Sequence, residues 1–315
     1  MTSIATVFST PKWGKEAEDR MQHRELRDEI PWNYDLFREV LEKYSKIPPE
    51  QVKDEIFKIR ERAFQVARYP CIAKFSYLRL AEFGPDGTEM HGVIKRLKAP
   101  DSQDTFLEIG GFICQTLRRL AFEGVDTTRL YGTDLHDEWF DLGYDLFRDR
   151  ETMKATFVAG DMLLPDDEYA SSQLAKTLNG KITIAHAANF FHLFTLDAQL
   201  VICERIARFF RNQSDTKQPA VLFGTHVGTA TAGEVRTRSL RSYAHDQKTF
   251  QSLWDEVGRR TGTRWAASMR VADIPLESSA FGKDARATRY IVRRGSDSKT
   301  LGESVDSYLT TLGRT

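Results

Sequence analysis

The chain has 315 residues, of which 41% are hydrophobic and 29% are charged, and its 45 basic side chains balance its 45 acidic ones. This length suits one large domain or two smaller ones. A formal net charge of zero excludes the strong positive field that nucleic-acid binding normally needs. No run approaches the roughly 18 apolar residues of a membrane span, and the N-terminus lacks the apolar core of a secretory signal. We therefore expect a cytosolic globular protein with neither a nucleic-acid nor a membrane partner.

Three cysteines occur, Cys71, Cys114 and Cys203, and none has the CxxC spacing of a redox or zinc motif. An odd number without such spacing argues against a disulfide framework. We expect the three to be reduced and most of them to be buried.

The first hundred residues read as helices. Residues 31–44 and 48–69 each begin with proline, and apolar side chains follow at helical spacing. Residues 71–97 fit a further helical pair, although their apolar run also fits a strand.

A change of pattern near residue 100 predicts three regions. These are a helical cap or lid over residues 1–100, an α/β domain over 101–295 and a tail over 296–315. The cap contributes aromatic residues that fit either a lid excluding water from a ligand or the surface of a homodimer, namely Trp32, Tyr34 and Phe37.

From residue 105 onward, short apolar runs alternate with amphipathic helices, which is typical of a parallel sheet covered on both faces. The runs are residues 105–110, 129–135, 155–162, 181–188 and 220–227. The helices between them are residues 113–124, 136–150, 167–180 and 196–212. After a helix at 248–262, residues 263–273 and 287–294 are two strands joined too closely for a helix crossover, and we expect them to be antiparallel. The predicted fold is a doubly wound, seven-stranded, mostly parallel sheet that closes in an antiparallel pair.

Ligands of a doubly wound sheet bind at the carboxyl ends of its strands. Residues 108–111 (EIGG) end the first run and open a helix, and the glycines let the backbone approach a ligand closely. Asp134 ends the second run, where a carboxylate can accept both ribose hydroxyls. At the end of the third run, Asp161 fits an adenine amino group and Met162 fits its ring. Each feature alone also fits a tight turn or a helix N-cap, but together they predict a nucleoside cofactor.

A nicotinamide cofactor is the natural rival. It requires G-x-G-x-x-G, and this chain has Gly110, Phe112 and Gln115 at the three glycine positions. S-adenosylmethionine carries no phosphate and does not need those glycines. The pattern therefore favours S-adenosylmethionine.

The segments that carry these residues also show a resemblance. The series FLEIGGFICQTLRRLAFEGVDTTRLYGTDLHDEWFDLGYDLFRDR, then FVAGD and ANFFHLFTLDAQ, with ARYPCIAKFSYLRL upstream, resembles fungal secondary-metabolism methyltransferases of meroterpenoid pathways. The resemblance covers roughly residues 34–294. It implies a Rossmann-like class I methyltransferase fold with a helical N-terminal cap, and formation of methyl esters or ethers on polyketide–terpenoid acids and phenols.

The resemblance also implies roles for residues at the strand ends. The methionine part of the cofactor is surrounded by Gly110, Gly111 and Gln115, the ribose by Asp134, and the adenine by Asp161 and Met162. The expected cofactor set is completed by Glu108, Leu135, Gly160 and Ala187. His136 follows Asp134 closely enough to line the edge of the same site.

Methyl transfer needs little side-chain chemistry, because the methyl group on a sulfonium is already a strong electrophile. A carboxylate acceptor is ionised at neutral pH and needs no base, whereas a phenol, with a pKa of about 10, would benefit from a histidine. The candidates are His186 and His192, which flank the end of the fourth strand, and His226 at the end of the fifth. Each also fits a structural histidine, and without an HExxH spacing we expect no metal site. We expect Arg118 and Arg119 to lie on a solvated helix face.

Two functions remain open from the sequence. The first is O-methylation of a hydrophobic small-molecule acid or phenol, with methyl-ester formation favoured because no base is conspicuous. The second is a protein of the same fold that binds S-adenosylmethionine without transferring methyl, as a regulatory partner or a non-methylating cyclase. The bulky Phe112, Ile113 and Cys114 in the glycine turn motivate this second function.

Overall fold

The structure is a computed structural model, and it describes residues 26–30, 33–84, 88–229, 231–236, 241–275 and 285–295. Trp32 and the expected tail lie outside the described residues. Within the described ranges, none of the helices has the length and apolar character that crossing a membrane requires. Cys114 and Cys203 are buried as expected, whereas Cys71 is exposed.

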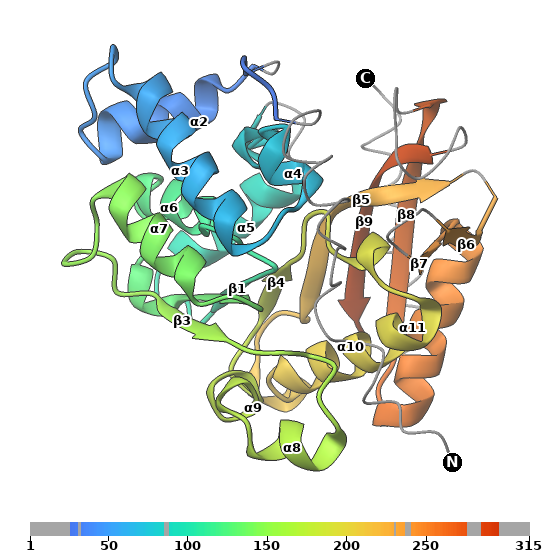
Figure 1. Cartoon of the computed structure of the whole chain (residues 1–315). Coiled ribbons are helices and arrows are strands. Elements are labelled where there is room, and N and C mark those ends of the chain that lie inside the picture. Colours follow the sequence, from blue (N-terminus) through green and yellow to red (C-terminus); the bar gives the residue numbers. More distant parts are fainter. Residues whose placement is uncertain are drawn as a thin grey trace.

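A seven-stranded sheet forms the centre of the molecule, in the order β3-β2-β1-β4-β5-β9-β8 (Figure 1). The strands are β1 (Phe106–Ile109), β2 (Leu130–Asp134), β3 (Thr156–Ala159), β4 (Ile184–His186), β5 (Val221–Thr229), β8 (Trp265–Pro275) and β9 (Ala285–Arg294). β1 to β5 pair in parallel, and β9 lies antiparallel between β5 and β8. The predicted class I methyltransferase sheet with its antiparallel C-terminal pair is thus confirmed. Because β1 to β5 run the same way, their carboxyl ends meet at one edge.

One face of the sheet is covered by α8 (Asp166–Ser171), α9 (Gln173–Leu178), α10 (Leu196–Phe209) and α11 (Gln247–Thr261). The single helix expected over 167–180 is therefore two helices. Ser172 separates them, because its backbone is extended and its hydroxyl accepts a hydrogen bond from the Ala175 N–H, which caps α9. The sequence also missed a short hairpin before α11, formed by β6 (Gly233–Arg236) and β7 (Arg241–Ala244).

The other face carries α6 (Gln115–Phe122), α7 (Glu138–Phe147) and the N-terminal helices (Figure 1). The N-terminal elements are α2 (Asp35–Glu39), the π-helix η2 (Val40–Tyr44), α3 (Val52–Val66), α4 (Pro70–Ala73), the 3₁₀ turns η3 (Ser76–Leu78) and η4 (Ala81–Phe83), and α5 (Thr88–Lys98). The first two expected helices are present in their described parts, and the described residues of 71–97 form helices and turns rather than a strand. We call residues 33–98 the cap.

The cap shares one apolar core with α6, α7 and the sheet face beneath them. Phe37, expected on a lid, is fully buried and packs edge-on against Phe147 of α7 at 5.8 Å between ring centroids. Tyr34 is half-buried against the same core. Phe37 therefore anchors the cap to the sheet domain, and does not line a surface open to a ligand.

Arg118, expected on a solvated face, has no exposed surface at all. Its guanidinium donates to both carboxylate oxygens of Asp149, at 3.0 and 3.3 Å, and to the carbonyl oxygen of Ile113 at 3.0 Å. The Tyr44 hydroxyl of the cap donates to the same carboxylate at 3.0 Å. The expectation was wrong because the cap covers the side of α6 that faces away from the sheet. A buried arginine is tolerated here because its charge is paired and most of its donors are used.

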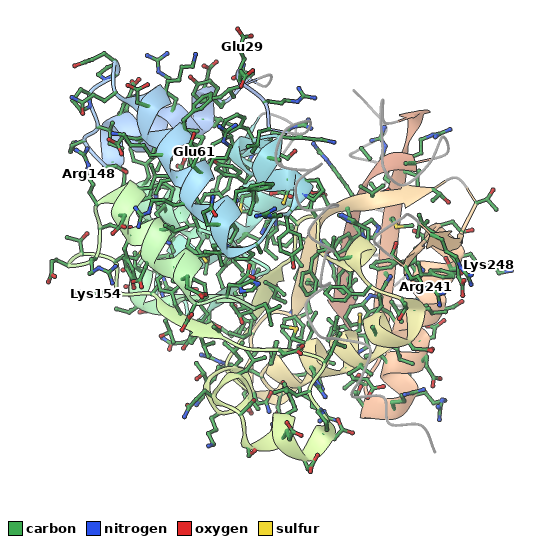
Figure 2. All side chains as sticks on the ribbon, viewed as in Figure 1. Glu29, Glu61, Arg148, Lys154, Arg241 and Lys248 are labelled. Carbon is green, nitrogen blue, oxygen red and sulfur yellow. The ribbon has the colours of Figure 1, made fainter. Side chains whose placement is uncertain are left out.

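Arg119 is also mostly buried, with 8% of its surface exposed. It donates to Glu39 of α2 at 2.8 Å and to Glu123 at 2.6 Å, and so it bridges the cap to α6. Exposed basic side chains such as Arg148 and Lys154 project outward in Figure 2. The two arginines of α6 are therefore structural.

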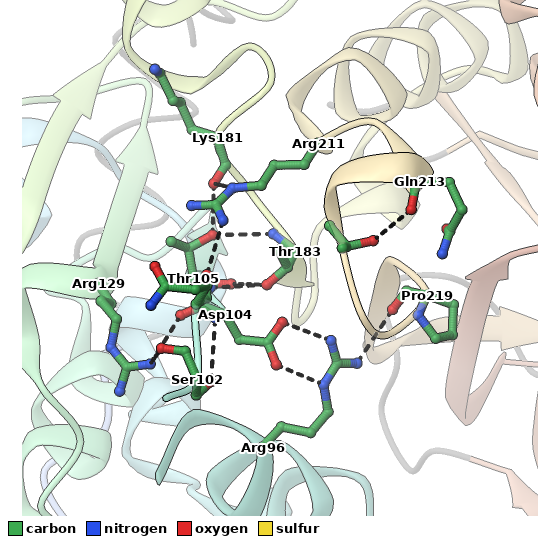
Figure 3. Close-up of polar contacts among 12 residues, drawn as sticks. Arg96, Ser102, Asp104, Thr105, Arg129, Lys181, Thr183, Arg211, Gln213 and Pro219 are labelled. Atoms are coloured by element: carbon green, nitrogen blue, oxygen red, sulfur yellow. Dashed lines mark hydrogen bonds and ion pairs between the residues drawn. The ribbon is translucent and has the colours of Figure 1, made fainter. Parts of the chain in front are cut away.

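Polar contacts fasten the edge of the sheet opposite the strand carboxyl ends (Figure 3). Arg96 of α5 donates two hydrogen bonds to Asp104, at 3.1 and 2.9 Å, just before β1. Thr105 and Thr183 exchange backbone and hydroxyl hydrogen bonds of 2.9 to 3.1 Å at the starts of β1 and β4. These contacts fix the register of the two central strands, so that their far ends are placed reproducibly.

We expect Asp149→Ala to lower the free energy of unfolding by about 3–5 kcal/mol, because it leaves Arg118 charged, buried and unpaired. Urea denaturation followed by circular dichroism measures the change. Asp141→Ala, which removes an exposed partner of Arg150, is the control and should leave stability nearly unchanged. Equal effects of the two substitutions would contradict the structural role given to Asp149.

Candidate active site

The glycine turn after β1 is bonded to the end of β2. Gly110 has a φ of +64°, which a side chain disfavours, and the N–H groups of Gly110 and Gly111 both donate to the Thr133 carbonyl oxygen, at 2.9 and 3.2 Å. A Cβ on Gly111 would lie 2.7 Å from Cys114 Sγ and 3.1 Å from Glu108 Cγ, so that glycine is required for packing. The turn is thus a fixed feature of the strand ends.

Phe112 and Cys114 adopt left-handed backbone conformations, with φ of 53° and 50°, although neither is glycine. Such residues cost of order 1–3 kcal/mol each unless the surroundings hold them. Arg118 holds them by donating to the carbonyl of Ile113 and, at 3.5 Å, of Cys114. The Ile113 and Cys114 side chains are fully buried in the core beneath the cap. The bulky residues that seemed to crowd the turn therefore point into the protein.

Asp134 lies at the end of β2, beside this turn. Its carboxylate accepts hydrogen bonds from the N–H groups of Phe112 at 2.8 Å and Leu135 at 2.6 Å. Burial raises the pKa of Asp134 to about 6, although hydrogen bonds from these two N–H groups and from the backbone N–H of His136 lower it. Asp134 is therefore mostly ionised at pH 7. Leu135 beside it is unusually exposed for an apolar residue, at 44%. Such a pair suits a nucleoside, because the carboxylate can accept the hydroxyls of the sugar and the apolar side chain can pack against the flat base.

Several buried polar atoms around the turn have no hydrogen-bond partner within the described part of the chain. They are Glu108 Oε2, Gln115 Oε1, Thr133 Oγ1 and His136 Nε2. Leaving such atoms unpaired costs about 1–3 kcal/mol each, and natural proteins rarely do so without a ligand or water. Burial raises the pKa of Glu108 to about 7, and protonated His186 and the Thr116 hydroxyl act in the opposite direction. These atoms fit a ligand with an ammonium and hydroxyl groups, as the expected cofactor has.

The loop after β3 joins the same edge of the sheet. The Gly160 N–H donates to the Asp134 carbonyl oxygen at 2.9 Å, which places the loop beside the end of β2. Asp161 accepts the Leu163 N–H at 2.7 Å in a local turn, and Met162 is 7% exposed. The residues expected around the adenine thus lie next to the residue expected at the ribose.

Arg205 of α10 fixes this loop, and sequence reasoning missed it. Its guanidinium donates to the carbonyl oxygens of Met162 and Leu164 and lies 4.0 Å from the centre of the Tyr169 ring. Arg205 lies more than forty residues after the loop that it binds, and nothing in the sequence links the two. An arginine in an amphipathic helix is normally interpreted as a surface residue.

His186 at the end of β4 faces the cap. Its Nε2 lies 3.0 Å from the Glu82 carboxylate, and it is 1% exposed. Burial lowers its pKa, but the charge and hydrogen bonding of Glu82 outweigh burial, so that the net pKa is raised. A raised pKa favours the protonated form of His186, and that form cannot act as a general base. Glu82 carried no recognisable motif in the sequence.

His192 lies in the turn after β4 and is buried. Its Nδ1 accepts the Val227 N–H at 3.3 Å, so that the neutral ring carries its proton on Nε2. Burial lowers its pKa to about 4. His192 is therefore neutral at pH 7 with its basic nitrogen already occupied, and it can donate a hydrogen bond from Nε2 but not accept a proton there.

His226 of β5 points to the opposite face of the sheet from His186. Its ring packs against Phe191, Phe250 and Tyr290, with centroids 5.1 to 6.4 Å apart, and burial lowers its pKa well below the usual range. The three histidines do not converge on one point. Among the described residues, no group of three or more His, Cys, Asp and Glu is arranged to hold a metal.

The sequence also missed His245, which follows β7. Its ring nitrogens lie 3.0 Å from Gln199 Oε1 and 3.1 Å from Thr249 Oγ1, and burial lowers its pKa to about 4. Ala187, expected beside the cofactor, is fully buried, and its carbonyl accepts the Tyr290 hydroxyl at 2.5 Å. Its backbone oxygen is thus used in fastening the loop after β4 to β9.

A pocket lies between the cap and strands β5 and β9, and it opens to solvent. Its cavity volume is about 10 Å³, which is room for about one water molecule. Met90 and Phe223 give it apolar walls, and Glu82 and Arg289 give it charged ones. His186, the last residue of β4, pairs with Phe223 of β5, and Thr225 lies two residues further along β5, where it pairs with Arg289. The pocket therefore lies near the edge of the sheet where the parallel strands end.

Comparison with known proteins identifies the family. Residues 26–78 match the family described as the meroterpenoid methyltransferase N-terminal domain. The O-methyltransferase phiE of a fungal species (strain ATCC 74256) is 38% identical over 235 residues, which is 74% of each chain. The chain belongs to the fungal meroterpenoid-type methyltransferase family. This family includes the Asnovolin E/Chermesin D methyltransferase nvfJ of Aspergillus novofumigatus, 36% identical over 72% of this chain and 77% of the relative.

This methyltransferase is also similar to O-methyltransferase atr3 of Stereocaulon alpinum, at 32% identity over 77% of this chain and 69% of the relative. Among solved structures, phosphoethanolamine N-methyltransferase 2 of Haemonchus contortus in complex with S-adenosyl-L-methionine aligns with a TM-score of 0.44 and 13% identity, over 76% of this chain and 60% of that one. The resemblance expected from the sequence is confirmed. Of the two functions left open, the relatives support the enzyme, a methyltransferase of secondary metabolism.

We expect His192 and His245 of this methyltransferase to stay neutral from pH 8 to pH 5, because burial lowers both pKa values to about 4. NMR of the protein labelled with ¹⁵N in histidine measures the ring protonation. Spectra of His192→Asn and His245→Asn assign the signals. A titration midpoint between pH 6 and pH 7 for either ring would contradict the prediction.

Proposed function

We propose that this methyltransferase transfers the methyl group of S-adenosylmethionine to the carboxylate oxygen of a hydrophobic small-molecule acid, forming a methyl ester. The observation that carries this proposal is the state of the three expected histidines. His186 is ion-paired with Glu82, which raises its pKa; His192 has its basic nitrogen occupied, and His226 is packed among aromatic rings. A carboxylate is ionised at neutral pH and requires none of them.

The cofactor would be held by the residues around the glycine turn. The unpartnered Glu108 oxygen suits its ammonium, Asp134 its ribose hydroxyls, and Leu135 its adenine, with Asp161 and Met162 at the far edge. S-adenosylmethionine supplies a methyl group made electrophilic by the positively charged sulfur. S-adenosylmethionine has no phosphate, so its binding does not need the phosphate-binding glycines of a dinucleotide site. This chain lacks those glycines.

The pocket under the cap is the proposed binding place of the acceptor, and it has to widen for the acceptor to enter. Met90 and Phe223 suit an apolar skeleton. The negative charges of Glu82 and Glu89 in this pocket are balanced by Arg289 and protonated His186. The walls therefore select for hydrophobic character and add no net charge that would repel an acid.

The chain's own contribution to the reaction is positioning and exclusion of water. Tyr69 of the cap packs edge-on against Trp139 at 5.9 Å, and Tyr77 packs against Phe112 at 5.1 Å. Burial and the nearby charge of Asp134 raise the pKa of Tyr69 to about 12, so that this ring lies near Asp134, the residue proposed to bind the ribose. These aromatic side chains cover the turn and keep water from the reacting groups.

We expect Asp134→Ala to weaken binding of S-adenosylhomocysteine by about 10- to 100-fold, the value of one or two hydrogen bonds to a charged group. Isothermal calorimetry at pH 7.5 measures the dissociation constant. Asp137→Ala, which removes an exposed carboxylate three residues further on, is the matched control and should bind like the original protein. Equal affinities for all three proteins would exclude Asp134 from the cofactor site.

We expect His192→Ala to retain methyl transfer to a carboxylic acid within about tenfold, since a general base contributes 10²- to 10⁴-fold. Transfer of a labelled methyl group to hydrophobic aromatic acids, and to phenols with the same skeleton, measures the rate. The acids should be methylated and the phenols should not. Methylation of the phenols, with a thousandfold loss in His192→Ala at unchanged cofactor affinity, would replace the ester proposal with a base-catalysed ether.

A further inference from the structure

Three buried ionisable groups connect the cap to the proposed cofactor site. Glu82 of η4 lies 3.0 Å from His186 of β4, and His186 is the register partner of Glu108 on β1. Register partners on neighbouring strands lie about 5 Å apart and point to the same face. Glu108 and His186 are 4% and 1% exposed, and the Glu82 side chain is 17% exposed. The three groups form a continuous row from the cap to the glycine turn.

The surroundings of this row make its charges effective. The rings of Phe106 and Phe223 lie 6.1 and 5.0 Å from the His186 ring and keep water away, so that charges in the row are weakly screened. Arg289 of β9 faces Glu82, and Arg118 of α6 faces Glu108. The neutral groups that face the two carboxylates are the hydroxyls of Thr225 and Thr116 and the N–H of Leu117.

We propose that Glu82 is a positioning residue for cofactor binding: its ion pair fixes protonated His186 beside Glu108, whose carboxylate receives the ammonium group of the cofactor. The inference rests on the proposed cofactor site, because Glu108 must contact the cofactor for Glu82 to act through it. Glu82 itself belongs to the cap and acts without touching the cofactor. In this proposal the cap supports cofactor binding through the charge of Glu82, in addition to excluding water from the site.

The sign of the effect follows from the two opposing influences on each group. Burial alone lowers the pKa of His186, and the Glu82 charge raises it again. Burial raises the pKa of Glu108 to about 7, and protonated His186 lowers it. Without the Glu82 charge, His186 becomes neutral and Glu108 stays protonated to a higher pH. Since only ionised Glu108 attracts an ammonium group, cofactor affinity falls as pH decreases through about 7, and loss of Glu82 moves this fall to higher pH.

Glu82→Gln tests the inference, because glutamine keeps the shape and can accept a hydrogen bond from His186 but carries no charge. Calorimetry with S-adenosylhomocysteine at pH 6, 7, 8 and 9 gives the ratio of the dissociation constants of the variant and the original protein. The amino group of the ligand titrates equally in both, and its effect cancels in the ratio. A rise of one unit in the pKa of Glu108 predicts a ratio of about 5 at pH 7 and less than about 2 at pH 9.

Two further variants separate the possible failures. Glu61→Gln removes an exposed cap carboxylate on α3, which projects from the surface in Figure 2, and its ratio should be near 1 at every pH. Glu108→Gln should weaken binding at pH 8 and 9, where Glu108 is ionised, and weaken it less at pH 6, where Glu108 is mostly neutral. If Glu108→Gln does not weaken binding at pH 9, the proposed cofactor site is wrong. If Glu108→Gln weakens binding while the Glu82→Gln ratio stays constant with pH or stays near 1, the cofactor site stands and the role of Glu82 is overturned.

The unaltered protein offers a second test that does not depend on a variant folding. With ¹⁵N-labelled histidine, both ring nitrogens of His186 should be protonated at pH 7, and His186→Gln assigns the signal. A neutral His186 ring at pH 7 would overturn the inference.

Discussion

The buried ion pair between Arg118 and Asp149 is the contact on which the cap and the candidate site both depend. It joins three parts of the chain that are far apart in sequence, since Tyr44 of the cap donates to Asp149 and Arg118 donates to the carbonyls of the turn after β1. Most proteins use further glycines in such a turn, whereas this one supports non-glycine residues in left-handed conformations. The turn therefore owes its shape to tertiary contacts and not to its own composition.

The two faces of the sheet differ in their chemistry. On the cap face, Glu82, His186 and Glu108 form a row of charges next to the glycine turn. On the opposite face, His226 is held without charge among aromatic rings. A residue shift of one along a strand moves a side chain from one environment to the other. The pKa of His186 is thus raised and that of His226 is lowered, which separates the proposed electrostatic support of the cofactor from the apolar packing that holds β9 in place.

The sheet, its antiparallel end and the positions of Gly110 and Asp134 were predictable, because they follow from local periodicity and from a topology that gathers strand ends at one edge. The burial of Arg118 was not predictable, since an amphipathic pattern does not reveal that a second layer covers the polar side of a helix. Arg205 and Glu82 act through partners about forty and one hundred residues away, and neither lies in a motif. Their roles arise from packing that no local pattern encodes.

The distance along the chain between the cap and its partners in and just after α7 also has a consequence during synthesis. The cap leaves the ribosome first, but Phe37 has its ring partner at Phe147 and Tyr44 has its hydrogen-bond acceptor at Asp149. For the time needed to translate about a hundred residues, apolar helices of the cap have no sheet to cover. The nascent N-terminal segment is consequently a natural substrate for chaperones that bind exposed apolar surface, until α7 has emerged and the core can close.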